Sequence, residues 1–159
     1  MKTPGYGSNC EASCVGSCGR EWKAHGNRCY YFSRTEKSWF DADKFCQKSG
    51  GHLASVTDVQ SHNFIEGKNA EAYWRWIGGV REQGNKTWVW TDCSPWTFNK
   101  WAGGEPKNEV DNEGCLVHTH DNQWSEDLCT DERRFVCSTT VCSGKTTFKS
   151  LKLMKEISR

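Results

Sequence analysis

The 159-residue chain lacks several features that would assign it to common classes of protein. No apolar run approaches the roughly 18 residues that a membrane-spanning helix needs, and no apolar stretch near Met1 could serve as a secretory signal. No Ser-His-Asp order and no glycine-rich phosphate loop is present. With 21 Lys and Arg against 20 Asp and Glu, the chain also lacks the basic excess of nucleic-acid-binding proteins. We therefore expect no membrane span, no nucleic-acid partner, no catalysis and no organic cofactor.

Cysteine, by contrast, is abundant. The chain has ten Cys and nine Trp, and cysteines at this density persist as disulfides only outside the reducing cytosol. We therefore expect a mature, secreted, extracellular protein. The sequon Asn85-Lys86-Thr87 would be usable in that compartment, and we predict Asn85 as an N-glycosylation site.

Local patterns predict a mixture of helices and short strands. Residues 38–48 read as a helix that Ser38 caps, and a second helix is predicted from Thr57, with Gln60 completing a capping box, to near Gly67. The predicted strands are residues 28–32, 74–79, 87–91, 116–118 and 135–138. Residues 93–113 show little periodicity and are predicted to form a long loop, which in compact domains is usually functional or disordered.

Both ends of the chain differ from the middle. Residues 1–17 are rich in Gly, Ser and Cys and are interpreted as a Cys-containing tail, and residues 18–138 as the folded domain. Residues 139–159 form a basic tail in which Phe148, Leu151, Met154 and Ile157 recur every three residues. That tail is interpreted either as an amphipathic helix or as a frayed end.

The order of these segments resembles the C-type lectin-like domain. The resemblance covers about residues 18–137 and rests on motifs that occur in the family's order. These are Cys29-Tyr30-Tyr31-Phe32, Gly51-His52-Leu53-Ala54-Ser55-Val56, Trp76-Ile77-Gly78-Gly79, Trp88-Val89-Trp90, Glu105-Pro106-Lys107 and the set Cys115, Trp124, Cys129 and Cys137. It implies an α+β, disulfide-stapled fold with two helices, small antiparallel sheets and a long loop.

The resemblance also implies disulfide pairs. Cys46 should pair with Cys137, Cys115 with Cys129, and Cys18 with Cys29. The remaining cysteines, Cys10, Cys14, Cys93 and Cys142, have no implied partner. Cys10 and Cys14 lie in the predicted tail, so we expect them to form interchain bonds in a disulfide-linked homodimer.

In sugar-binding members of the family, one calcium ion in the long loop also binds two sugar hydroxyls. Calcium prefers six to eight oxygen ligands. Of the five positions that the resemblance assigns to it, Glu105 and Glu113 match, whereas Ser125 and Glu126 replace the family's Asn-Asp. Lys107 replaces an Asn or Asp, and an ammonium group cannot bind calcium. Calcium is therefore doubtful here, at a degraded site of Glu105, Glu113 and Glu126.

Residues 105–132 hold nine acidic residues and one base, Lys107. Such a charge attracts cations, so Lys107 is interpreted as a built-in counter-ion standing where calcium would, or as an ordinary solvent-facing lysine. In the first interpretation a sugar binds without metal. The predicted sugar-binding residues are Glu105, Lys107, Glu113, Ser125, Glu126 and Trp96, with galactose-type or mannose-type recognition undetermined.

We therefore expect a secreted, glycan-binding lectin with weakened or absent calcium dependence, acting in host defence. Two alternatives remain: a lectin-fold protein that recognises a protein partner, and an ice-binding relative. A glycosidase pair among Glu105, Glu113 and Glu126, and zinc held by His118 and His120, are weaker interpretations of the same residues.

Overall fold

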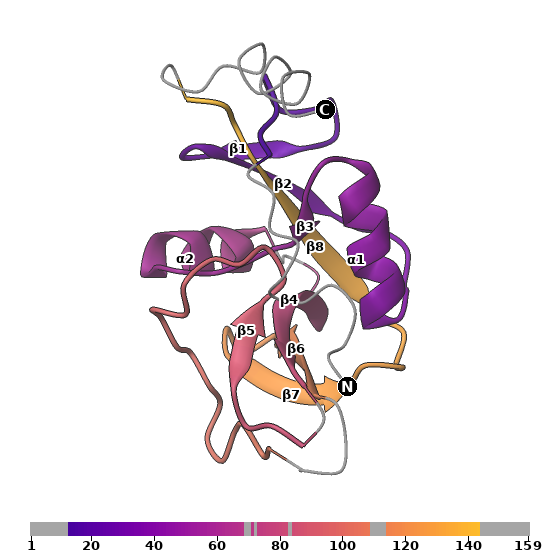
Figure 1. Ribbon diagram of the computed structural model, residues 1–159, viewed down its shortest axis with the longest axis vertical. Helices are drawn as coiled ribbons and strands as arrows, with labels where there is room; N and C mark the ends of the chain where they lie inside the picture. Colours follow the sequence, from indigo (N-terminus) through magenta and orange to yellow (C-terminus); the bar gives the residue numbers. More distant parts are fainter. Residues whose placement is uncertain (1–12, 69–70, 72, 83, 109–113, 144–159) are drawn as a thin grey trace, which may run out of the picture.

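The computed structural model describes residues 13–68, 71, 73–82, 84–108 and 114–143, and within them the chain forms two helices and eight strands (Figure 1). The elements in chain order are β1 (Lys23–His25), β2 (Arg28–Phe32), α1 (Trp39–Lys48), β3 (His52–Leu53), α2 (Val59–Gly67), β4 (Arg75–Arg81), β5 (Trp88–Trp90), β6 (Gly114–His118), β7 (Trp124–Leu128) and β8 (Arg134–Thr140).

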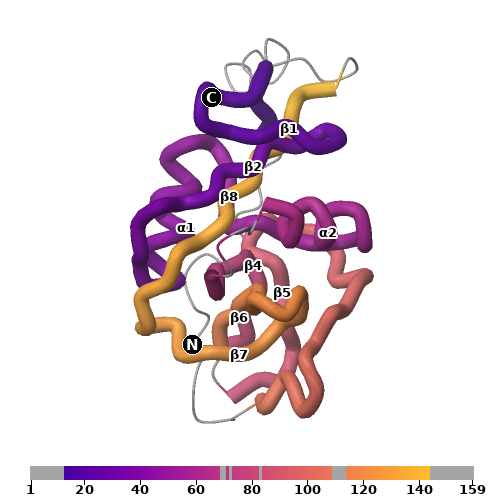
Figure 2. The backbone as a smooth tube through the Cα atoms, turned by 180° about the vertical axis from the view of Figure 1, so that it is seen from behind, coloured from indigo at the N-terminus to yellow at the C-terminus, as the bar shows by residue number. Residues whose placement is uncertain are grey.

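The strands form one sheet in the order β1-β2-β8-β4-β6-β7, with β3 also pairing with β8 and β5 with β4. All pairs are antiparallel except β4 with β8, where Arg75 faces Arg134 and Trp76 faces Phe135. The helices lie on opposite sides of the central strands in both views (Figure 1, Figure 2). The predicted α+β fold with two helices is confirmed.

Helix α1 forms where the sequence predicts it. The Ser38 hydroxyl accepts a hydrogen bond from the Asp41 amide at 3.3 Å, which satisfies one of the amides that a helix start leaves unpaired. Its inner face buries Trp39, Ala42 and Cys46. The Trp39 indole donates to the Ile77 carbonyl at 2.8 Å, so the helix is anchored directly to β4.

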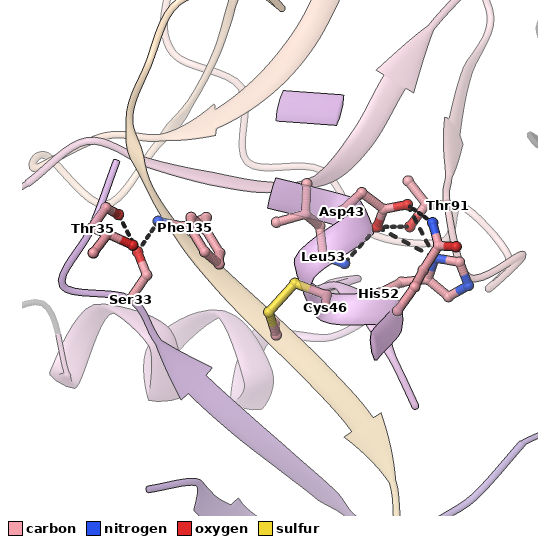
Figure 3. The surroundings of a disulfide bond; sticks show 10 residues. Ser33, Thr35, Asp43, Cys46, His52, Leu53, Thr91 and Phe135 are labelled. Atoms are coloured by element: carbon pink, nitrogen blue, oxygen red, sulfur yellow. Dashed lines mark hydrogen bonds and ion pairs between the residues drawn. A yellow bond between two sulfur atoms is a disulfide. The ribbon is translucent and has the colours of Figure 1, made fainter. Parts of the chain in front are cut away.

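Asp43 ties α1 to two other segments of the chain. Its side chain is 2% exposed and accepts hydrogen bonds from the Leu53 amide at 2.8 Å and the Thr91 hydroxyl at 3.3 Å (Figure 3). The hydrogen bond with Asp43 raises the pKa of His52. A buried carboxylate is stable only with such partners, so Asp43 fixes both β3 and the point where the long loop leaves β5.

The cap of the second helix lies one residue later than the sequence predicts. This cap is Asp58, whose carboxylate accepts from the Ser61 amide at 2.7 Å. The Thr57 carbonyl instead accepts from the Thr97 hydroxyl of the long loop at 3.1 Å. The predicted Thr57–Gln60 capping box is therefore wrong, because the neighbouring aspartate takes the capping position.

Four disulfides join described cysteines: Cys14–Cys142, Cys18–Cys29, Cys46–Cys137 and Cys115–Cys129. The last three have the pairing that the family resemblance implies. The expectation that Cys14 forms an interchain bond is wrong, because its partner is Cys142 of the same chain. Cys93 is also disulfide-bonded. Cys10, the other cysteine expected to link two chains, lies outside the described residues.

The Cys14–Cys142 bond belongs to a short backbone pairing at the end of β8. The Val15 amide donates to the Thr140 carbonyl at 2.8 Å, and the Cys142 amide donates to the Val15 carbonyl at 2.8 Å. The described part of the predicted N-terminal tail therefore lies against the end of the domain. The helix predicted in residues 148–157 lies outside the described residues.

Candidate functional site

The long loop that follows β5 is held by a cluster of five tryptophans. Trp88 and Trp90 come from β5, Trp124 from β7, and Trp96 and Trp101 from the loop itself. The Trp96 ring stacks on Trp90 with centroids 4.3 Å apart and lies nearly parallel to Trp101 at 6.2 Å. Because aromatic pairs combine area burial with preferred geometry, this cluster gives the loop a packed base.

Trp96 fits there because Gly79 has no side chain. A Cβ atom at position 79 would lie 2.6 Å from Leu116 Cδ2 and 3.2 Å from Trp96 Cη2. The family strand that Trp76-Ile77-Gly78-Gly79 resembles has leucine at the last position, and here Leu116 and Trp96 fill that space. Trp96, which the sequence suggested as a sugar platform, is thus half-buried and packed against the core, whereas Trp101 and Trp124 are scaffold as expected.

Backbone hydrogen bonds bring the far side of the loop to β7. The Ala102 amide donates to the Trp124 carbonyl, and the Trp124 amide donates to the Lys100 carbonyl, both at 2.8 Å. The Glu126 amide donates to Glu105 Oε2 at 3.1 Å, and the Glu105–Pro106 peptide bond is cis, as the resemblance implies. Glu105, Ser125 and Glu126 are therefore neighbours, as predicted.

The centre of this site is an ion pair that sequence reasoning missed. Arg81, at the end of β4, donates through Nε and Nη2 to Glu126 Oε1 at 3.2 and 2.5 Å. The exposed fraction of the side chain is 0% for Arg81 and 9% for Glu126. Arg81 Nη1 also donates to the Asn85 carbonyl at 3.0 Å. The guanidinium is thus enclosed between β4, β7 and the turn after β4.

The second oxygen of Glu126 is also in use. The Asn108 amide donates to Glu126 Oε2 at 2.8 Å, and the Asn108 side-chain oxygen accepts from the Trp88 indole at 3.1 Å. Asn108 has φ +49°, a left-handed conformation that Asn tolerates better than most residues. Gly114 leaves the space that Glu126 occupies, because a Cβ there would lie 2.2 Å from Glu126 Oε1.

Lys107 lies beside Glu105 at the edge of the site. Its ammonium lies 3.7 Å from Glu105 Oε1, but the side chain is 63% exposed. The pair with Glu105 exists, yet the cation enclosed among the expected calcium ligands is Arg81. An arginine at the end of a strand gives no sequence signal for this role, since its partner lies 45 residues away across β6.

The described residues do not fit a calcium ion at this position. Both carboxylate oxygens of Glu126 accept hydrogen bonds from the protein, and a guanidinium beside them repels a second cation. Within the described ranges, no group of three or more His, Cys, Asp or Glu could hold a metal. Glu113, the other predicted ligand, lies outside those ranges. Ser125 is half-buried in β7.

The histidines considered for zinc do not form one site. His118 is fully buried, and its ring centroid lies 5.2 Å from that of His62. His120 is exposed, with its Nδ1 2.8 Å from the Trp74 indole nitrogen. Desolvation, followed by repulsion from His62, lowers the pKa of His118 to about 4. His118 is therefore neutral at physiological pH. Desolvation also lowers the pKa of His62, whose ring centroid lies 6.1 Å from that of Trp124.

Together, the stapled α+β scaffold, the cis proline and the loop packed on tryptophans define a lectin-like binding domain. The lectin C-type domain model matches residues 35–139. The chain belongs to the C-type lectin domain family, which is generally non-enzymatic. Within the described ranges, no helix is long and apolar enough to span a bilayer.

Known relatives differ in what they bind. The galactose-specific lectin nattectin of Thalassophryne nattereri is 32% identical over 84% of this chain and 87% of its own length. C-type lectin domain family 10 member A of Mus musculus is 32% identical over 77% of this chain, which spans only 42% of that protein. The structure of a calcium-independent type II antifreeze protein superposes with a TM-score of 0.73 at 28% identity, covering 82% of this chain and 97% of its own.

Proposed function

We propose that the chain is a secreted lectin that binds carbohydrate without calcium. The proposed site consists of Glu105 and Lys107 of the long loop and Ser125 and Glu126 of β7, and is called the loop-and-β7 site. The buried Arg81–Glu126 pair supports metal independence. Its guanidinium neutralises a carboxylate that would otherwise be available to coordinate calcium. The family membership and the likeness to a galactose-specific lectin support a carbohydrate ligand.

Glu105 and Lys107 are the groups most suited to sugar hydroxyls. A hydroxyl both donates and accepts, and the pair offers a carboxylate acceptor beside an ammonium with three donors, 3.7 Å apart. Glu105 is oriented by its bond from the Glu126 amide, while Lys107 is exposed and can move toward a ligand. Ser125 adds a hydroxyl, and Glu113 and Trp96 are proposed as further contacts. The glycan array described below would identify the class of sugar.

A glycan array, followed by titration calorimetry of the best ligand in calcium and then in EDTA, tests this function. We expect equal binding in both buffers. Lys107→Met should weaken binding about tenfold, because it removes a charged hydrogen-bond donor, whereas Lys44→Met on the exposed face of α1 should leave it unchanged. Binding that EDTA abolishes would refute the metal-free site. Absence of any glycan signal would refute the lectin function and favour a protein partner.

Ice is a second candidate ligand, favoured by the structural likeness to a calcium-independent antifreeze protein. A measurement of thermal hysteresis on the purified chain tests it. A freezing point depressed well below the melting point would support ice binding, and hysteresis equal to that of a lysozyme control would exclude it.

The disulfides support secretion, since such bonds persist in oxidising compartments. Asn85 is exposed and lies in a turn in which its side-chain oxygen accepts from the Thr87 amide at 2.9 Å, so a glycan there would extend into solvent. We propose that the chain is a secreted, non-enzymatic glycoprotein of innate defence.

A further inference from the structure

A positively charged cavity lies at the other end of β4 from Arg81. It has a volume of about 620 Å³. Arg75 and Arg81 are the first and last residues of β4, so at about 3.3 Å per residue the two ends lie about 20 Å apart. Two acidic residues line the cavity, Glu21 and Glu71, against five basic ones: Lys23, Arg34, Lys68, Arg75 and Arg134.

Arg75 forms the floor of this cavity. It is 5% exposed, its Nη1 donates to the Ser33 carbonyl at 3.2 Å, and its guanidinium lies over the rings of Phe32 and Tyr73 at 5.7 and 5.9 Å. Desolvation first, and then repulsion from Arg134, lower the pKa of Arg75. The surroundings of this guanidinium therefore favour the arrival of a negative charge.

Arg134 forms the wall, held in place by Tyr73. Its guanidinium lies 3.8 Å from the Tyr73 ring centroid, and its Nη1 donates to Glu71 Oε2 at 3.0 Å. The Glu71 side chain is 66% exposed, and such exposed ion pairs contribute little stability. A ligand carboxylate or sulfate can therefore displace Glu71 from Arg134 at small cost.

The cavity continues into a second, neutral one of about 440 Å³, which shares Tyr73 and Arg134 and adds Trp74. Tyr73 and Trp74 are 38% and 37% exposed. The Trp74 indole is fixed by its hydrogen bond with His120 and by Arg133, whose guanidinium lies 5.2 Å from the ring centroid. Exposed aromatic rings beside a cationic pocket fit a chain of sugar rings that carries acidic groups, rather than a single small anion.

We propose that this groove binds an acidic oligosaccharide, with a sulfate or carboxylate group between Arg75 and Arg134 and sugar rings against Tyr73 and Trp74. This inference is independent of the proposed function, because none of these residues belongs to the loop-and-β7 site. The groove would give the chain a second glycan contact at the far end of β4.

Titration calorimetry with the full, disulfide-bonded chain tests the proposal, using a heparin-derived hexasaccharide, its desulfated form and inorganic sulfate as probes. We expect the sulfated hexasaccharide to bind at least about tenfold more tightly than either other probe, as charged hydrogen bonds would produce. High salt should weaken the binding, because it screens charge. Equal affinity for inorganic sulfate, or no binding of the hexasaccharide, would overturn the proposal.

Matched variants locate the site. Arg134→Gln and the exposed Arg34→Gln should each weaken binding, whereas Lys44→Gln, with the same charge change on α1, should not. Glu71→Gln should strengthen binding several-fold, because it frees Arg134 and removes a repulsive charge, and a misfolded protein could not produce that gain. Lys107→Met should leave this binding unchanged, which separates it from the loop-and-β7 site. Equal losses for Lys44→Gln and Arg134→Gln, or no gain for Glu71→Gln, would refute the assignment.

Discussion

Arg81 and Glu126 form a buried ion pair in which two guanidinium nitrogens donate to one carboxylate oxygen, at 3.2 and 2.5 Å. The pair joins the end of β4 to β7, and the Asn108 amide completes the hydrogen bonding of the carboxylate. A buried positive charge therefore lies beside Glu126, one of the residues that the family resemblance assigns to calcium.

Removal of one partner should expose the cost of burying the other. Arg81→Met should lower the free energy of unfolding by about 3–5 kcal/mol, because Glu126 would remain buried without its cation. The double variant Arg81→Met, Glu126→Met should be less destabilised than Arg81→Met alone, since apolar pairs often replace buried ion pairs at little cost. Denaturant unfolding with disulfides intact measures both. A double variant no more stable than the single one would contradict this account.

The glycine opposite Glu126 should be as sensitive as the pair itself. In Gly114→Ala the new Cβ would lie 2.2 Å from Glu126 Oε1, so the carboxylate must move away from Arg81. We expect a loss of about 1–3 kcal/mol, typical of overpacking. Gly103→Ala is the control, because no atom lies within 4 Å of its Cβ position. Equal denaturation midpoints for the two variants would be inconsistent with the proposed crowding.

The parts of the fold that the sequence predicts well are local. The α1 helix follows from Ser38 and an apolar stripe that contains Trp39 and Cys46, both within one short segment. The α2 cap is misplaced by one residue because Thr57 and Asp58 can both cap a helix. The residue patterns predict no strand at β1, β3 or β7. Lys23–His25 and His52–Leu53 are too short to show a period, and Trp124–Leu128 does not alternate clearly between apolar and polar residues.

The candidate site could be predicted only in part, because its chemistry depends on register. The family resemblance places Glu105 and Glu126 together, and the structure agrees. It gives no means of knowing that Arg81 faces Glu126, since that contact requires β6 to lie between β4 and β7. For the same reason the sequence indicates only Lys107, which is adjacent in the motif, as the cation of this site. The packing of Trp96 could not be predicted, because it depends on the space left by Gly79.

The Cys14–Cys142 bond should contribute more stability than its peripheral position suggests. Its cysteines are 128 residues apart, but the Cys46–Cys137 and Cys18–Cys29 bonds shorten the loop that it closes. Replacement of both cysteines by alanine should therefore cost about 3.5 kcal/mol in the chain-entropy model. The same change at Cys18 and Cys29, separated by 11 residues, should cost about 3 kcal/mol. Thermal unfolding compares the two variants. Peptide mapping of mixed isotopically labelled chains should give a Cys14–Cys142 peptide within one chain, and a peptide that joins two chains would disprove the pairing.

The buried His62–His118 pair should make the domain sensitive to acid. In the unfolded chain His118 binds a proton as the pH falls through about 6.5, whereas burial lowers its folded pKa to about 4. The unfolded state therefore binds more protons between these values, so stability is complete above the unfolded pKa and is lost as the pH falls toward the folded pKa. Burial also lowers the pKa of His62, which acts in the same direction.

Denaturant unfolding between about pH 7 and pH 4 measures this loss, which should reach about 3 kcal/mol for His118. Glu66 Oε2 lies 3.9 Å from His118 Nε2. Burial raises the pKa of Glu66, so its protonation stabilises the folded state as the pH falls, opposite to the effect of His118. The parent chain must therefore be compared with a variant that retains Glu66. In His118→Gln the free energy of unfolding should fall much less steeply with acid than in the parent chain, whatever its absolute stability. Parallel pH profiles for the two proteins would show that His118 does not titrate on unfolding.

Glycan binding should follow the same pH dependence, because Trp124 packs against His62 with ring centroids 6.1 Å apart. We expect binding at the loop-and-β7 site to weaken over the same acidic range in the parent chain. In His118→Gln it should persist to lower pH.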